Sequence, residues 1–223
     1  MALPFVNMHT HQASGKGVEA VLNVILKGGE KPEIPSQGFY SCGIHPWYLE
    51  VDWDKKLLKK LLTDIAQNKR CVALGEAGLD KSIDIPLSQQ EDVFAMQAKL
   101  AEELGKPLII HCVKAYAEVL SVRKSTKAEQ VWIFHGFNSS VEMAQQLMDH
   151  GCMISLGKSL RNEKSKTRDV LSVLDNGQFF LETDDDDLSI EELYSLVAEL
   201  KAVSPEELKK AMYEKFHTVF NID

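Results

Sequence analysis

Two histidines near the start of the chain, His9 and His11, are separated by one residue and follow an apolar run at 3–8. The run contains Leu, Pro, Phe, Val and Met and is typical of a buried strand. Side chains at i and i+2 of a strand lie on one face, so both imidazoles point to the same side. Imidazole is the commonest metal ligand in proteins, and two on one face supply half of a metal site. A surface pair or a hydrogen-bonded core pair is the alternative.

Further metal-ligating side chains stand at the ends of other apolar runs. They are His45 after 39–44, Glu76 at the end of 71–76, His111 in 107–112, His135 at the end of 130–135 and Asp184 after 178–183. A lone residue of this kind is often a buried, hydrogen-bonded histidine or a helix-capping acid. Repetition of the same position on several strands favours a shared binuclear metal site instead.

The predicted metal ligands are four histidines and two carboxylates, namely His9, His11, Glu76, His111, His135 and Asp184. This donor set suits two divalent ions of the Zn²⁺ type, with Mn²⁺ or Mg²⁺ as alternatives.

The elements that must position these ligands alternate along the chain. Strands are predicted at 4–9, 18–26, 39–44, 71–76, 107–112, 130–135, 152–157 and 178–183, and helices at 54–68, 88–104, 114–124, 140–150, 165–175, 189–202 and 205–219. Strands that alternate with helices of this length pair in parallel. Eight of them indicate an α/β fold of the TIM-type (β/α)8 barrel class, whose active site lies at the carboxyl ends of the strands.

Local signals mark the predicted helix ends. Four S-x-x-E capping boxes start helices, at Ser88 with Glu91, Ser139 with Glu142, Ser189 with Glu192 and Ser204 with Glu207. Gly105, Gly151 and Gly177 are expected to end helices.

The first third of the chain departs from the alternation. Only six residues separate His11 from Val18, and the segment between 26 and 39 is rich in Gly and Pro. A parallel crossover usually needs a dozen or more residues. We therefore expect a distorted, shortened barrel without its first two helices, in which the strand at 18–26 runs antiparallel to its neighbours.

Size and composition indicate one soluble domain spanning 1–223. The chain has a formal net charge of −8, which gives no broad basic surface for nucleic acid. Its four cysteines lack C-x-x-C spacing, so reduced thiols are expected. No run reaches the roughly 20 apolar residues of a membrane helix, and we expect a cytoplasmic protein that does not associate with membranes.

The strand-end motifs, taken together and in order, resemble those of the TatD-related metal-dependent deoxyribonucleases of the amidohydrolase superfamily. The motifs are Met8-His-Thr-His11, Gly43-Ile-His-Pro46, Leu74-Gly-Glu-Ala-Gly-Leu-Asp80, Ile110-His-Cys-Val-Lys-Ala115, Phe134-His-Gly-Phe-Asn-Ser-Ser140 and Leu181-Glu-Thr-Asp184. The resemblance implies a distorted TIM barrel with two divalent metal ions. It assigns a first metal to His9, His11, Glu76 and Asp184, and a second to Glu76, His111 and His135, with Glu76 as the bridge.

The same resemblance implies hydrolysis of DNA phosphodiester bonds, at nucleic-acid ends, by a water that the metals activate. Asp184 and Glu76 are the expected catalytic residues, with Asp184 taking the proton of the water. His45 and Lys114 are the expected contacts to a phosphate oxygen. Hydrolysis of a small ester or amide, and metal binding without turnover, are the alternatives.

Several positions depart from the family pattern around the substrate. Asn7 replaces the usual aspartate, and Val113-Lys114 replaces an Arg-Asp pair, so one arginine is lost. Acids at 185–187 follow Asp184 in place of a longer loop with basic residues. They would favour the next helix N-terminus but repel a phosphodiester. Trp47 and Tyr48 are either packed in their loop or available to stack a base.

Overall fold

The computed structural model describes residues 3–27, 30–50 and 54–222. The chain divides into two compact units. The first comprises Met1–Leu22 and Ile133–Asp223, and the second comprises Asn23–Trp132. The prediction of a single domain at 1–223 stays a prediction.

One sheet contains eight strands in the order of the sequence. They are β1 (Phe5–Thr10), β2 (Val18–Ile25), β3 (Phe39–Gly43), β4 (Cys71–Asp80), β5 (Leu108–Val113), β6 (Trp132–Phe134), β7 (Cys152–Leu156) and β8 (Phe179–Leu181). The first and last strands are joined in parallel by a bridge between Thr10 and Asp184. With helices between successive strands from β3 onward, this is the predicted TIM-type (β/α)8 fold class.

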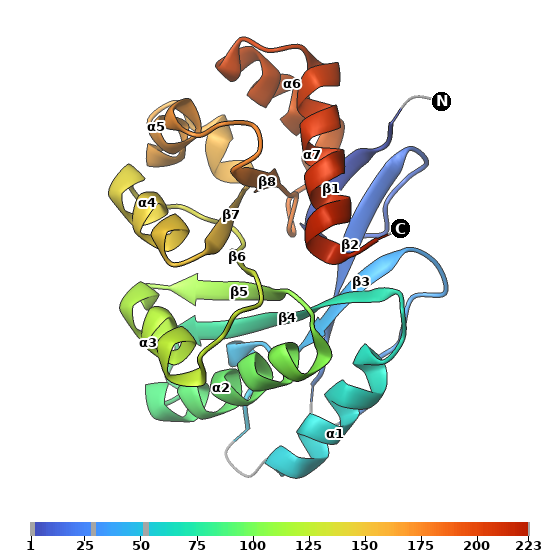
Figure 1. Cartoon of the computed structure of the whole chain (residues 1–223), viewed down its shortest axis with the longest axis vertical. Coiled ribbons are helices and arrows are strands. Elements are labelled where there is room, and N and C mark those ends of the chain that lie inside the picture. The colour runs from blue at the N-terminus through green and yellow to red at the C-terminus, as the bar shows by residue number, and fades with distance from the viewer. Residues whose placement is uncertain (1–2, 28–29, 51–53, 223) are drawn as a thin grey trace. The chain divides into compact units, whose positions relative to one another are not determined.

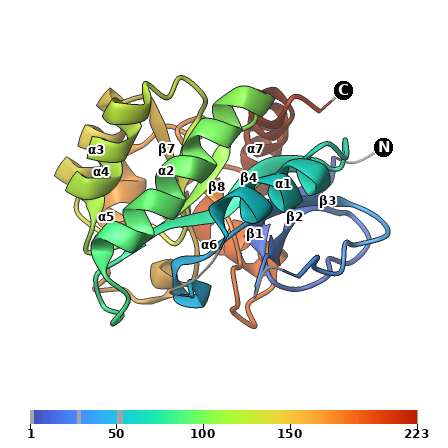
Figure 2. The same cartoon turned by 90° about the horizontal axis from the view of Figure 1, so that it is seen from below.

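Helices cover the strands within each unit. They are α1 (Lys55–Ala66), α2 (Leu87–Leu104), α3 (Tyr116–Thr126), α4 (Val141–Asp149), α5 (Lys166–Val173), α6 (Ile190–Lys201) and α7 (Pro205–Phe220), with short 3-10 helices η1 (Pro46–Tyr48) and η2 (Lys158–Arg161). In the second unit α1 contacts β3 and β4, and α2 contacts β4 (Figures 1 and 2). In the first unit α4 contacts β7, while α6 and α7 contact β1 (Figure 1).

Apolar spacing explains which helix face is buried. In α1 the buried residues are Leu58, Leu62, Ile65 and Ala66, which recur at the interval of a helical turn. The strand β4 is buried along its whole length, as expected for a parallel strand with helices on its outer face.

The prediction that the second strand runs antiparallel is wrong, because β2 pairs in parallel with β1. The amino ends of both strands lie together, with Phe5 opposite Val18 and the Phe5 N–H bonded to the Gly17 carbonyl at 2.8 Å. A six-residue strand spans about 20 Å, and the segment 11–17 is long enough to reach about 23–25 Å if fully extended. The chain therefore returns without a helix. Among the described residues no helix lies between β1 and β3, as predicted.

Two of the predicted helix caps are confirmed and two are misplaced. Ser189 and Glu192 form a reciprocal capping box, and Ser204 accepts a hydrogen bond from the Glu207 N–H. The Ser139 prediction is wrong by one residue, because Ser140 is the N-cap of α4. The Ser88 prediction is also wrong, since Pro86 precedes α2 and fixes an extended backbone there.

The predicted glycine ends differ in outcome. Gly105 ends α2 in the left-handed conformation, and Gly151, at φ 71°, follows the last residues of α4. Gly177 does not end a helix, because α5 stops at Val173 and is followed by Leu174.

The four cysteines are free thiols, as predicted. Burial raises the pKa of Cys71 to about 11 and that of Cys112 to about 12, so both are protonated and unreactive at neutral pH. Within the described part of the chain, no helix combines the length and apolar character required to cross a bilayer.

Candidate metal centre

A first cluster of metal-ligating side chains comprises His9, His11 and Asp184, all in the first unit. Their ligand atoms lie within 4.8 Å of one another. The Nε2 atoms of His9 and His11 lie 3.6 Å and 3.3 Å from the same atom, Asp184 Oδ1. Two imidazoles and one carboxylate that converge in this way form a donor set for a divalent cation.

The pairing of the first and last strands creates this cluster. The Asp184 N–H donates to the His9 carbonyl and the His11 N–H donates to the Asp184 carbonyl, both at 3.0 Å. Asp184 has a φ of 53°, in the left-handed region that non-glycine residues seldom occupy. Such backbone is retained where the surrounding structure requires it, often at functional sites.

The environment of Asp184 keeps its carboxyl ionised. Burial acts to raise its pKa, but hydrogen bonds from His11 and His9 and the nearby charge of His135 outweigh burial. The pKa of Asp184 therefore lies well below its usual range. The result is an anionic acceptor beside two imidazoles.

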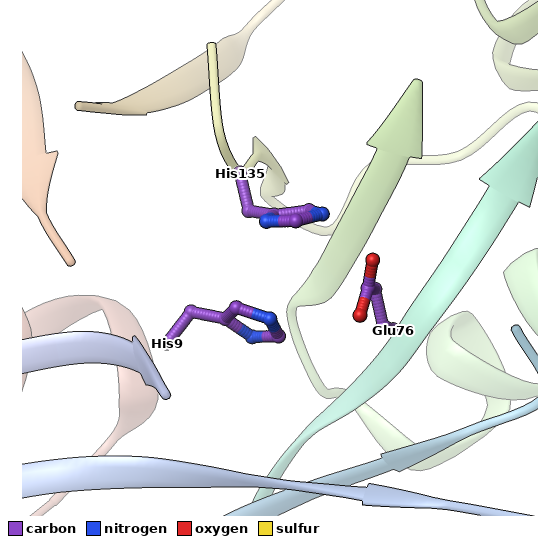
Figure 3. A group of neighbouring side chains, drawn as sticks. All are labelled: His9, Glu76 and His135. Carbon is purple, nitrogen blue, oxygen red and sulfur yellow. The ribbon is translucent and has the colours of Figure 1, made fainter. Parts of the chain in front are cut away.

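His135 follows β6 and lies beside this first cluster. The rings of His9 and His135 have centroids 4.5 Å apart (Figure 3). His135 Nδ1 faces Glu182 Oε1 at 3.5 Å, and the same oxygen accepts a hydrogen bond from the Gly136 N–H. Glu182 is 1% exposed. A buried carboxylate on one nitrogen of a histidine orients the ring and leaves the other nitrogen to bind a metal.

Asn7 links β1 to the segment that holds Asp184. Its amide donates to Thr183 Oγ1 at 2.8 Å and accepts from the Thr183 N–H at 3.0 Å. Asparagine can therefore both donate and accept here, whereas an ionised aspartate could only accept.

A second cluster, in the second unit, comprises His45, Glu76 and His111. Glu76 Oε1 lies 3.1 Å from His45 Nε2 and 2.9 Å from His111 Nδ1. Glu76 Oε2 accepts a hydrogen bond from the Asn23 amide at 2.8 Å. The Glu76 carboxylate, which extends from β4 (Figure 3), is thus fixed on both oxygens.

The two nitrogens of His45 have different partners. Nδ1 accepts a hydrogen bond from the Trp47 N–H at 3.1 Å, as the N-cap of η1. A neutral ring that accepts at Nδ1 carries its proton at Nε2. His45 is therefore a hydrogen-bond donor toward Glu76, because metal binding through Nε2 would place a proton on Nδ1 against the Trp47 N–H.

Asp80 contacts the ring nitrogen of His111 that does not face Glu76. Its Oδ2 lies 3.1 Å from His111 Nε2 and accepts the Trp47 indole N–H at 2.7 Å. Burial acts to raise the Asp80 pKa, but hydrogen bonds from Ser82, Trp47 and His111 lower it to about 2. The ionised carboxylate orients the His111 ring, with Nδ1 directed at Glu76.

Lys114, predicted to contact substrate, is exposed on the turn that follows β5, with a φ of 55°. Asp80, Glu182 and Asn23 were not among the site residues predicted from the sequence. A signal was present for Asp80, because it lies four residues from Glu76 on β4 and so shares a strand face with it. No comparable pattern marks Asn23.

The acids that follow Asp184 pair with basic residues after β7. Lys158 Nζ lies 2.7 Å from Asp185 Oδ1, and the Arg161 guanidinium lies 3.5 Å from Asp186 Oδ1. Asp186 also accepts the Leu188 N–H at 2.8 Å, at the turn into α6. Part of the added negative charge is therefore neutralised locally.

The residues of both clusters lie in the carboxyl-terminal halves of strands or beyond their ends, on the side where this fold class places its active sites. Histidines and carboxylates in this arrangement can bind divalent cations and activate water. The fold and the clusters together define a metal-dependent hydrolase.

Comparison with known proteins identifies the family. Residues 16–221 match the sequence model of the TatD-related DNases. The chain therefore belongs to the TatD family of metal-dependent hydrolases, as the motifs predicted. Over 199 residues it is 26% identical to an uncharacterized metal-dependent hydrolase, YjjV of Escherichia coli K12, covering 82% of this chain and 77% of the relative. Over 179 residues it is 30% identical to another, YabD of Bacillus subtilis strain 168, covering 73% and 70%.

Solved structures show the same fold. The crystal structure of the TatD homologue YjjV from Escherichia coli K12 superposes with a TM-score of 0.80 at 22% identity, over 98% of each chain. A TatD-family hydrolase from Entamoeba histolytica gives a TM-score of 0.78 at 14% identity, also over 98% of each chain.

Proposed function

We propose that this protein is a deoxyribonuclease that cleaves the phosphodiester bonds of DNA from the strand ends, using two divalent metal ions. The observation that supports this most is the pair of imidazole–carboxylate clusters in a chain of the TatD-related DNase family. Zn²⁺, Mg²⁺ and Mn²⁺ are the candidate ions.

The donor atoms fit such ions. The first cluster offers two Nε2 atoms and an ionised carboxylate oxygen around one point, and Glu76 has two oxygens that can serve different cations. Following the family pattern, we assign His9, His11, Glu76 and Asp184 to a first metal, and Glu76, His111 and His135 to a second.

The bound ions would supply charge stabilisation at the phosphate and lower the pKa of a water toward neutrality. Asp184 remains ionised and can accept the proton of that water. The His45 Nε2–H, which faces Glu76 in this structure, would move its hydrogen bond to a non-bridging phosphate oxygen when Glu76 holds the metals, while its other nitrogen stays held by the Trp47 N–H. Exposed Lys114, on the turn after β5, offers a further positive charge. The free thiols support a cytoplasmic location.

The test is release of nucleotides from end-labelled single-stranded DNA with Mg²⁺, Mn²⁺ or Zn²⁺. Wild-type protein should shorten the strand from one end, and Glu76→Ala should lose at least about 100-fold in kcat. Glu163→Ala, an exposed acid on the segment after η2, is the matched control and should cleave like the wild type.

Equal cleavage by Glu76→Ala and wild type would contradict the assignment. Wild-type protein that hydrolyses small esters or amides but leaves DNA intact would replace the proposed substrate with a small molecule.

A further inference from the structure

Trp47 is a large aromatic side chain that is both exposed and firmly anchored. It is 57% exposed, although its indole N–H donates at 2.7 Å to the Asp80 carboxylate, which is completely buried. Its backbone N–H is bonded to His45 Nδ1. An aromatic ring of this size is normally buried, so a fixed ring open to solvent requires an explanation.

The surroundings of Trp47 are those of the second cluster. Its ring packs edge-on against His45, with centroids 5.0 Å apart, and against His111, at 5.9 Å. A group bound at these histidines therefore lies next to the indole. Because Asp80 and the backbone already hold the ring, little side-chain entropy is lost when a ligand stacks on it.

The neighbouring Tyr48 does not offer a comparable surface. The Lys27 ammonium lies over its ring, 4.1 Å from the centroid. A stacking ligand would have to displace this cation. Of the two aromatic residues that the sequence suggested for stacking a base, Trp47 is the one whose ring is accessible to a ligand.

We propose that Trp47 is the substrate-recognition residue of this enzyme, and that it stacks on a planar nucleobase while the phosphate lies at the histidine–carboxylate cluster. The inference rests on the proposed phosphodiesterase function and specifies its substrate class as a nucleotide. Asp80 is the positioning residue, since one carboxylate orients both the indole and His111.

The expected effect follows from the strength of base stacking. Stacking of one base on an aromatic side chain changes affinity by about 5- to 100-fold. A ligand with a base should gain this factor over the same ligand without one.

The experiment compares dAMP with 2-deoxyribose 5-phosphate, which lacks the base, by titration calorimetry in the presence of Mn²⁺. Neither compound contains a phosphodiester bond, so binding is measured without turnover. Wild type should bind dAMP about 5- to 100-fold more tightly. In Trp47→Ala this ratio should fall to near one, and in Trp47→Phe, which keeps a ring but loses the bond to Asp80, it should be intermediate. Leu57→Ala removes another exposed apolar side chain and should keep the wild-type ratio.

The outcomes separate this inference from the proposed function. An unchanged ratio in Trp47→Ala with normal circular dichroism overturns the inference, even if the enzyme cleaves DNA. A wild-type ratio near one also overturns it. A ratio that Trp47→Ala abolishes supports the inference, even if no DNA cleavage is found.

Discussion

His45 shows how one hydrogen bond can decide the role of a histidine. Its Nε2 lies 3.1 Å from Glu76 and belongs to a cluster that could hold a cation. Its Nδ1, however, accepts the N–H of Trp47 and thereby fixes the proton on Nε2. A ring with this tautomer donates a hydrogen bond and does not bind a metal through Nε2.

We expect His45→Ala to keep its metal and lose activity. Removal of one hydrogen-bond donor to the reacting phosphate should lower kcat by about 100- to 1,000-fold. Metal content measured by mass spectrometry after dialysis should remain that of the wild type. His111→Ala should lower the metal content as well.

Exposed His150, at the end of α4, provides the matched control for these variants. His150→Ala should keep both metal and activity. Loss of metal in His45→Ala would show that His45 is a ligand and that its tautomer differs from the one described.

The sequence identified the histidines and carboxylates at the strand ends because each follows an apolar run. It could not identify the carboxylates that orient these ligands, Glu182 and Asp80. Asp80 shares a strand face with Glu76, and Glu182 directly follows β8, but their partners, His111 and His135, come from other segments of the chain. The exposure of Trp47 is likewise a property of the folded chain.

At the scale of elements, the second cluster depends on close packing of β4 against β5. Gly78 pairs with His111 in this register. A Cβ atom built on Gly78 would lie 1.8 Å from the His111 carbonyl oxygen, which no rotation of a side chain can relieve. The absent side chain lets Glu76 and Asp80 lie beside His111.

Gly78→Ala should therefore destabilise the protein by about 2–4 kcal/mol, because the strands must separate to accept a methyl group. Urea unfolding followed by circular dichroism measures this. Gly15→Ala is the control, since no atom lies within 4 Å of its Cβ position, and it should change stability by less than about 0.5 kcal/mol. A Gly78→Ala protein as stable as wild type would contradict the strand packing described.

Helices and strands were predictable where periodicity and caps agreed, as in α6, whose capping box is formed by Ser189 and Glu192. The direction of β2 could not be predicted in this way. The usual length of a parallel crossover assumes a helix, whereas the segment 11–17 returns through bends and a turn without one. α2 begins at Leu87, directly after Pro86 and without a side-chain cap, so the S-x-x-E pattern of Ser88 and Glu91 did not mark its start.

At the scale of the whole molecule, net charge says little about the site. The chain carries a formal charge of −8, yet Lys158 and Arg161 pair with the acids that follow Asp184. Repulsion of a phosphate by these acids is therefore weaker than the sequence implies. Attraction of the substrate has to come from the metal ions and a few local cations.

Lys215 couples the stability of the fold to pH. Its ammonium lies 4.4 Å from the centre of the Phe180 ring and 5.3 Å from that of Phe179, with the Asn176 carbonyl at 3.4 Å. Burial lowers its pKa from 10.5 to about 7. Above about pH 10.5 the side chain is neutral in both states. Between pH 10.5 and 7 the unfolded chain takes up a proton that the folded chain does not, so stability falls as the pH is lowered through this window.

Replacing Lys215 with methionine removes this proton uptake and should stabilise the protein at pH 7 by about 1–2 kcal/mol. This gain is smaller than the full fall in the Lys215 pKa would give, because the side chain is only half-buried. The advantage over wild type should shrink as the pH rises toward 10. Urea unfolding at pH 7 and pH 10 measures both values. Lys210→Met alters a lysine that is 67% exposed on the same helix and is solvated in both states, so it should show no such pH dependence. An equal difference between Lys215→Met and wild type at both pH values would mean that water reaches the Lys215 ammonium in the folded protein.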